Sequence, residues 1–152
     1  MRTFTSPEQL QQAVGEELGT SDWVLIEQAR VDLFAEATDD HQWIHVEPER
    51  AAQGPFGGTI AHGYLTLSLL PRFGWEIYRL ENVTTAINYG LNRVRFIHPV
   101  RVGARIRSTA TLVSVTEIPG GVQLVVSHRV DVEVDGTPKP ACIAETISRA
   151  LF

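Results

Sequence analysis

The sequence predicts an α+β domain in which a long antiparallel sheet wraps around one central apolar helix. The first half of the chain shows helical patterns and ends in a strongly apolar segment. The second half consists of four long runs that are rich in Val, Ile and Thr and alternate between apolar and polar residues. Gly, Pro or Asp-Gly turns separate these runs, as expected for antiparallel strands. Helices followed by a meander of strands are typical of the α+β class.

The elements before the central helix are predicted from local start and stop signals. Ser6 has the chemistry of an N-cap and Pro7 suits the first helical position, so a helix is expected to begin here. Gly19 is expected to end this helix. A short strand at 22–28 and a second helix at 29–38 follow in the sequence.

The most apolar segment of the chain, at 60–78, predicts the central helix, and a Gly/Pro-rich loop precedes it. The predicted strands lie within 84–100, 103–118, 120–134 and 139–152. A long sheet curved around one helix is the hotdog fold. Because 152 residues are enough for one sizeable core but not for two, residues 1–152 are predicted to form a single domain.

Composition limits the class of function. The net charge of -5 and the pI near 5.5 disfavour a nucleic-acid or membrane-surface binder, because such proteins need a basic face. The single cysteine, Cys142, leaves no partner for an intramolecular disulfide and is expected to be a small buried apolar residue. No stretch has the length and apolarity of a signal peptide or a membrane helix. We therefore expect a soluble, cytoplasmic protein.

One basic stretch stands out in this acidic chain. Two interpretations are open: the stretch contacts a phosphorylated ligand, or it forms a solvated strand face. The residues are Arg93, Arg95, Arg101, Arg105 and Arg107.

A polar cluster at 38–45, "TDDHQWIH", is the main candidate for chemistry. His41 and His45 are four residues apart, as in a metal-binding helix, but no Glu stands beside the first histidine and no metal is expected. A polar loop without function is a second interpretation. The third is an acid/base pair that holds one water, facing backbone amides at the start of the central helix, where Gly63 allows close approach to an oxyanion.

The segments "DHQWIH" at 40–45 and "IAHG" at 60–63 resemble the signature of the MaoC-like, (R)-specific enoyl-CoA hydratases. In that family the pattern is Asp, any residue, Asn, Pro, an aliphatic residue and His, with His-Gly at the start of the central hotdog helix. "NRVRFIHPVRVG" at 92–103 is similar to a strand of the family. The resemblance covers about residues 20–150 and is closest to nodulation-protein-N-like members.

The resemblance implies roles for four residues. Asp40 and His45 hold and activate the catalytic water, and the Gly63 amide binds the thioester oxygen. Gln42 stands at the Asn position of the pattern and is expected to contact the substrate. The implied reaction is the reversible hydration of trans-2-enoyl-CoA to (R)-3-hydroxyacyl-CoA, without a metal or another cofactor beyond the coenzyme A of the substrate.

Two other functions remain open. A hotdog thioesterase would use the same ligand for a different reaction, and a non-catalytic subunit would only bind an acyl thioester or act as a scaffold. A homodimer is the expected working unit. A sheet of this kind leaves a long apolar edge unpaired, and a second chain would cover it.

Overall fold

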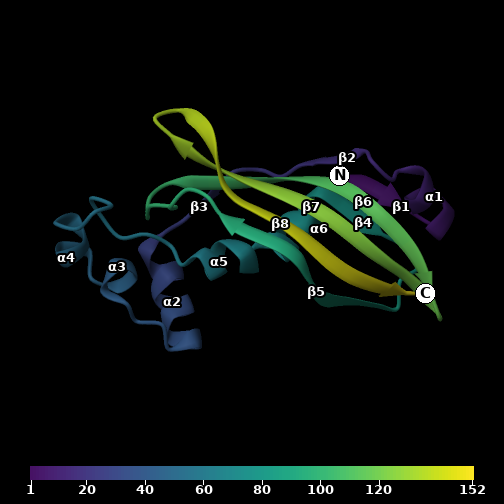
Figure 1. The fold of residues 1–152 in the computed structure, drawn as a ribbon, viewed down its shortest axis with the longest axis horizontal. Coiled ribbons are helices and arrows are strands. Elements are labelled where there is room, and N and C mark those ends of the chain that lie inside the picture. Colours follow the sequence, from purple (N-terminus) through teal and green to yellow (C-terminus); the bar gives the residue numbers. More distant parts are fainter.

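Four long strands carry the fold, as predicted. In the computed structural model, which describes residues 1–152, they form an antiparallel sheet with the spatial order β6-β7-β8-β5 (Figure 1). Their bounds are β5 (Thr85–Phe96), β6 (Arg105–Ile118), β7 (Gly121–Val134) and β8 (Thr137–Leu151). Two short strands, β2 (Glu17–Thr20) and β3 (Val24–Leu25), pair with β6, so that β5 stands at the opposite edge of the sheet.

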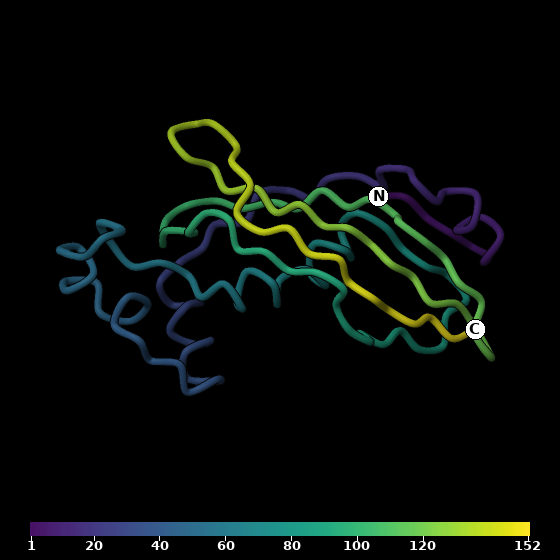
Figure 2. The backbone as a smooth tube through the Cα atoms, viewed as in Figure 1, coloured from purple at the N-terminus to yellow at the C-terminus, as the bar shows by residue number.

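The hairpin between β7 and β8 follows from an Asp-Gly pair. Asp135 and Gly136 have φ angles of 50° and 73°, which is the backbone of a two-residue turn whose twist matches that of the strands. This hairpin projects beyond the rest of the sheet in Figure 2. The turn thereby fixes the register of β7 against β8 at this end, from Val134↔Thr137 onward.

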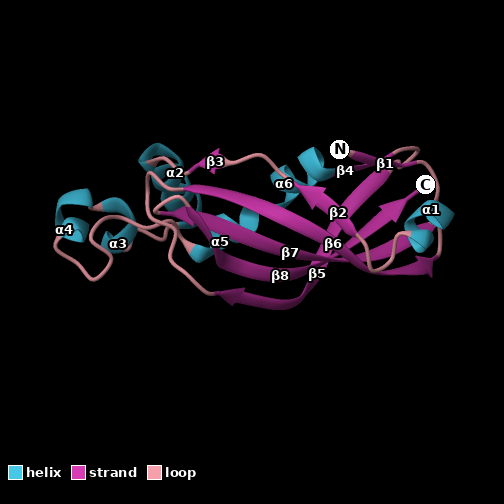
Figure 3. Cartoon of the chain, turned by 90° about the horizontal axis from the view of Figure 1, so that it is seen from above, coloured by secondary structure: helices cyan, strands magenta, loops and turns pink.

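The concave face of the sheet covers the central apolar helix (Figure 3). This helix consists of two pieces, α5 (Gly63–Ser68) and α6 (Leu70–Ile77), instead of the single helix predicted at 60–78. It begins at Gly63 because Ile60 forms a β-bridge with Arg101. It is interrupted at Leu69 because Pro71, in the first turn of α6, has no N–H to continue the helical hydrogen bonds.

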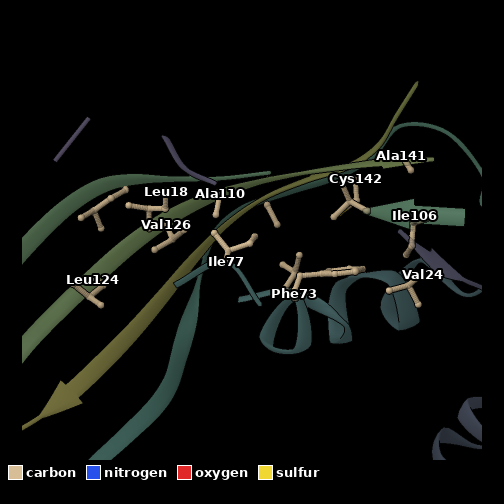
Figure 4. Packing of buried hydrophobic residues seen from close by; sticks show 14 of the residues in the cluster. Leu18, Val24, Phe73, Ile77, Ile106, Ala110, Leu124, Val126, Ala141 and Cys142 are labelled. Carbon is tan, nitrogen blue, oxygen red and sulfur yellow. The ribbon is translucent and has the colours of Figure 1, made fainter. Parts of the chain in front are cut away.

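Apolar residues alternate with polar ones along the strands, and the apolar ones form the core between the sheet and the central helix. Phe73 and Ile77 of α6 lie on the helix side of this core, Leu124 and Val126 of β7 lie on its sheet side, and all four side chains are buried (Figure 4). Cys142 of β8 is also fully buried, and burial raises the pKa of its thiol to about 11. The prediction that this cysteine is a small core residue is therefore confirmed.

The N-terminal region differs from the prediction. Helix α1 (Pro7–Gln12) starts at its Ser6 cap as expected, but it ends before Gly15 and does not reach Gly19. The amide of Gly15 donates to the carbonyl of Leu112, which brings the chain into β2 beside β6. The structure also contains a parallel pair that the sequence pattern did not predict, between β1 (Arg2–Phe4) and β4 (Tyr78–Leu80).

Three helices lie at the end of the sheet where α5 begins (Figure 1). They are α2 (Gln28–Thr38), which was predicted, and the short α3 (Trp43–Val46) and α4 (Pro48–Ala52). The chain between α2 and α4 carries the polar cluster. None of the helices has the length and apolarity needed to span a membrane.

Candidate active site

The turn after α2 brings Asp40 to the site. Helix α2 is capped at its C-terminal end by Asp39, which has a φ of 58°, a left-handed conformation that Asp tolerates better than most residues other than Gly. The chain reverses there, and the next residue, Asp40, points a half-exposed carboxylate toward His62. Asp40 Oδ1 also accepts a long hydrogen bond, 3.5 Å, from the backbone amide of Gln42.

His45 is buried in α3 and has the properties of a neutral base. Its Nδ1 lies 2.7 Å from the carbonyl oxygen of Ile60, and because a carbonyl only accepts, Nδ1 carries the proton. The second ring nitrogen, Nε2, therefore has a free lone pair. Burial lowers the pKa of His45, against the opposing effects of the Ile60 hydrogen bond and the Asp40 charge. At neutral pH the imidazole is ready to accept a proton.

His62 is a site residue that the sequence analysis assigned no role. It is 2% exposed, and its Nε2 donates to the backbone carbonyl of Asp40 at 3.0 Å and lies 3.9 Å from Asp40 Oδ2. Its ring stacks on that of His45, with centroids 3.8 Å apart and an interplanar angle of 23°. Its Nδ1 is buried without a partner. The available signal is the "AHG" triplet at 61–63, in which the sequence pattern indicates a function for Gly63 alone.

The three side chains converge. One nitrogen or oxygen atom from each of Asp40, His45 and His62 lies within 4.8 Å of the others. Two hydrogen bonds of ordinary length span about this distance, so the spacing is compatible with one water held between Asp40 and His45. The geometry suits a metal poorly, because nearly parallel stacked rings direct their in-plane lone pairs side by side and not toward one point.

Gly63 follows His62 directly and is the first residue of α5, so its amide N–H has no partner within the helix. A side chain at this position would collide with Phe96 of β5, because a Cβ would lie 2.9 Å from the ring. The glycine is thus required by the close approach of an aromatic ring. Phe96 also contacts Tyr64 edge to face, with ring centroids 5.8 Å apart. An amide donor and an aromatic wall therefore lie beside the polar cluster.

The remaining residues of the cluster have different surroundings. Gln42 is exposed at the start of α3, and its side chain makes no hydrogen bond. Trp43 packs over Gly54 and under the guanidinium of Arg50, which lies 4.6 Å from the ring centroid. His41 pairs with Glu36 on the surface at 2.7 Å, which raises the pKa of this histidine. His41 and His45 therefore do not meet as a metal pair.

The arginines of the basic stretch do not form one patch. Arg105 makes two hydrogen bonds of 2.8 Å to the carboxylate of Glu133, and Arg107 stacks over Trp23 at 4.5 Å. Arg101 donates to the carbonyl of Gly57 at 2.6 Å. Arg93 and Arg95 lie on the edge strand β5.

The amino-acid sequence of the chain matches a known family. Residues 9–134 match the family described as MaoC like domain. The chain belongs to the MaoC-like family. Among the relatives of this MaoC-like chain, 3-hydroxyacyl-thioester dehydratase Z of Mycobacterium tuberculosis H37Rv is 59% identical over 150 residues, which cover 98% of both chains. Nodulation protein N of Rhizobium leguminosarum bv. viciae is 47% identical over 141 residues, covering 91% of this chain and 87% of that protein. The predicted likeness to nodulation-protein-N-like members is confirmed.

Solved structures confirm the hotdog fold of this MaoC-like chain. The (R)-hydratase from A. caviae involved in PHA biosynthesis superimposes with a TM-score of 0.71 at 22% identity, covering 89% of this chain and 94% of that chain. The R-hydratase PhaJ1 from Pseudomonas aeruginosa has a TM-score of 0.71 at 22% identity, with coverage of 91% and 81%. At these identities the likeness establishes the shared fold.

Proposed function

We propose that this MaoC-like protein is a hydro-lyase that catalyses the reversible hydration of trans-2-enoyl-CoA to (R)-3-hydroxyacyl-CoA. The observation that carries the proposal is the pairing of a neutral imidazole with a carboxylate. His45 Nε2 is free, burial keeps the ring uncharged, and the Asp40 carboxylate is close enough for one water to bridge the two groups. The 59% identical relative is named as a 3-hydroxyacyl-thioester dehydratase, which is the same chemistry written in reverse.

In the direction of hydration, the water between Asp40 and His45 gives a proton to His45 Nε2 as its oxygen bonds to C3 of the enoyl chain. The electron pair of the C2–C3 double bond moves toward the thioester carbonyl. The negative charge that develops on that oxygen is stabilised by the Gly63 amide. The proton then passes to C2, so that one water is added and the imidazole returns to its neutral state. Asp40 orients the water and stabilises the imidazolium.

His62 completes this arrangement as a positioning residue. Its hydrogen bond fixes the backbone of Asp40, and its ring supports the face of His45. It also directly precedes Gly63, so one residue links all three proposed catalytic groups. The (R) configuration of the product is supported by the "DHQWIH" segment, which resembles the signature of (R)-specific hydratases. The exposed Gln42 side chain is assigned to substrate contact at the mouth of the site.

The working unit is proposed to be a homodimer that forms through the edge strand β5. This strand pairs only with β8, and its other edge is free. Exposed apolar side chains lie along β5 and on the neighbouring helices, as is usual for a protein interface. They are Tyr64, Trp75, Ile87, Tyr89, Leu91 and Phe96.

One assay separates the proposed function from its two alternatives. Crotonyl-CoA and longer enoyl-CoAs are incubated with the protein while the enoyl thioester absorbance and the free thiol are measured together. Loss of absorbance without thiol release is expected for a hydratase. Release of thiol would instead identify a thioesterase, and binding without either change would identify a non-catalytic subunit. Chiral analysis of the 3-hydroxy product tests the configuration.

A further inference from the structure

A second feature of the concave face lies outside the catalytic cluster. A cavity of about 570 Å³, open to solvent on one side, is lined by residues of α6, β4, β5, β7 and β8. Its helix side is apolar and includes Leu70, Gly74 and Trp75. Its sheet side is polar, with contributions from His128 and Ser148 among others. The cavity is therefore amphipathic, with one wall that suits hydrocarbon and one that offers hydrogen bonds.

His128 is the most deeply buried ionisable group of this wall. It is 3% exposed and stands on β7 between Ala110 of β6 and Ala144 of β8, whose small side chains leave space around the imidazole. Its Nδ1 lies 3.2 Å from Oγ of the fully buried Ser108. Its Nε2 makes no hydrogen bond within the protein, and the residue lines the cavity. Desolvation lowers the pKa of His128 to about 4, so the ring is neutral at physiological pH.

A purely structural histidine would be expected to satisfy both ring nitrogens within the core, because an unpaired buried polar group is costly. Here one nitrogen is held by Ser108 and the other is left for whatever occupies the cavity. A plain hydrocarbon chain would displace water from Nε2 and give no hydrogen bond in return. An occupant with a suitably placed oxygen atom would restore that bond.

The position of the cavity connects it to the proposed reaction. Leu70 and Gly74 lie about two and three helical turns beyond Gly63 along the α5–α6 segment. A thioester bound at Gly63 with its acyl chain running along this segment would therefore place the far part of the chain in the cavity. Short acyl chains would not extend to His128.

We propose that the cavity binds the distal part of an acyl chain that carries a hydroxyl or keto oxygen, and that His128 is the hydrogen-bond partner of this oxygen. Ser108 orients the imidazole so that Nε2 faces the chain. His128 is thus a residue that determines substrate specificity, remote from the reacting carbons. The inference rests on the proposed hydratase function.

The first experiment compares trans-2-enoyl-CoA substrates of equal length, such as dodecenoyl-CoA, with and without one hydroxyl or keto group placed at successive distal carbons. The wild-type protein is expected to favour the best-placed oxygenated substrate by about tenfold or more in kcat/KM, mainly through KM. His128→Phe keeps a ring of similar size and should remove this preference, whereas His128→Gln should retain part of it. Thr146→Val is the matched control, because the Thr146 hydroxyl already donates to the carbonyl of Val126 and should not affect the preference.

The second experiment measures binding without turnover. The ring-nitrogen chemical shifts of His128, assigned by their loss in His128→Gln, are followed in isotope-labelled protein during titration with saturated acyl-CoA analogues. An oxygenated analogue should move the Nε2 signal, and the plain analogue should not. If every enoyl-CoA is inert but this signal still responds, the hydratase proposal fails and the binding inference stands. If hydration occurs with equal kcat/KM for both substrates and His128→Phe changes nothing, the inference is overturned.

Discussion

The imidazole of His62 stacks on that of His45 at a centroid distance of 3.8 Å while its Nε2 donates to the backbone carbonyl of Asp40 at 3.0 Å. One buried ring therefore contacts both proposed catalytic residues. Burial lowers the pKa of His45, and repulsion from the charge of the stacked His62 ring acts in the same direction.

The role of His62 predicts that its two contacts are separable by substitution. His62→Phe retains an aromatic ring against His45 but removes the hydrogen bond to Asp40, and kcat for crotonyl-CoA is expected to fall by about tenfold or more because the water is no longer held in place. His62→Ala removes both contacts and should lower kcat further. The measurement is steady-state kinetics with circular dichroism as the folding control. Unchanged kcat in His62→Phe would leave this histidine without a positioning role.

Removal of either member of the catalytic pair should be more severe. Asp40→Asn or His45→Gln is expected to lower turnover by at least about a hundredfold, the usual contribution of a positioned acid or base. The pH dependence of kcat/KM should show an acid limb below 6.5, because the pKa of His45 is lowered and protonation removes the base. In Asp40→Asn the residual activity should persist to lower pH, because the Asp40 charge raises the pKa of His45. Near-normal rates in either variant would refute the assigned roles.

His128 predicts how stability depends on pH. Its pKa is about 4 in the folded protein against an ordinary value of 6.5, so between these values the unfolded chain binds a proton that the folded protein excludes. Stability is therefore complete above about pH 6.5 and falls as the pH is lowered toward 4, with a loss of about 2 kcal/mol at pH 5. Urea unfolding at pH 7 and 5 measures this loss. The pH-dependent loss should be clearly smaller in His128→Phe, and an identical loss would assign it to other groups.

The positions of Arg93 and Arg95 predict that their substitution affects the KM of CoA thioesters and pantetheine thioesters differently. Arg93→Gln and Arg95→Gln, on the exposed edge strand, are expected to raise KM several-fold for CoA thioesters but not for pantetheine thioesters, which lack the nucleotide phosphates. Arg105→Gln is the control, because Arg105 is already paired with Glu133. Equal effects on both kinds of thioester would show that Arg93 and Arg95 do not bind the CoA phosphates and only form a solvated strand face.

The proposed dimer predicts a mass of twice the 16.8 kDa chain in light scattering. Leu91→Lys, in the middle of β5, should shift the protein toward the monomer because it places a charge in the apolar interface. Leu33→Lys changes another exposed leucine, on α2, and should leave the mass unchanged. A fully active wild-type monomer would show that β5 is not covered by a second copy.

The sequence was a good guide where local patterns determine structure. Alternating residues predicted all four long strands, and the Asp135-Gly136 pair predicted the hairpin between the last two. The signal of Asp40 and His45 was also local, since both lie within six consecutive residues and His45 belongs to the short helix α3. Local patterns failed where long-range pairing decides the outcome: α1 ends early because Gly15 bonds to Leu112, almost a hundred residues away in the sequence.

Contacts between side chains from segments that are distant in the sequence were equally hard to predict. The contact between His45 and His62 arises only when α3 and α5 are brought together, and no spacing within either segment indicates it. The arginines between 93 and 107 appeared as one basic stretch, but strand geometry and the turn between β5 and β6 distribute them over different surfaces. Arg105 and Arg107 lie beside Trp23, whereas Arg93 and Arg95 remain on β5.

The contact between Phe96 and Gly63 has a consequence for how the activity depends on the concentration of the protein. Phe96 is the last residue of the free edge strand β5, yet its ring lies against the residue whose amide is proposed to bind the thioester oxygen. Whatever covers β5 therefore also constrains one wall of the reaction site. By thermodynamic linkage, a thioester that orders this wall would tighten self-association, and self-association would in turn tighten thioester binding by the same factor. Specific activity is then expected to decline on dilution and to recover when substrate is added before dilution.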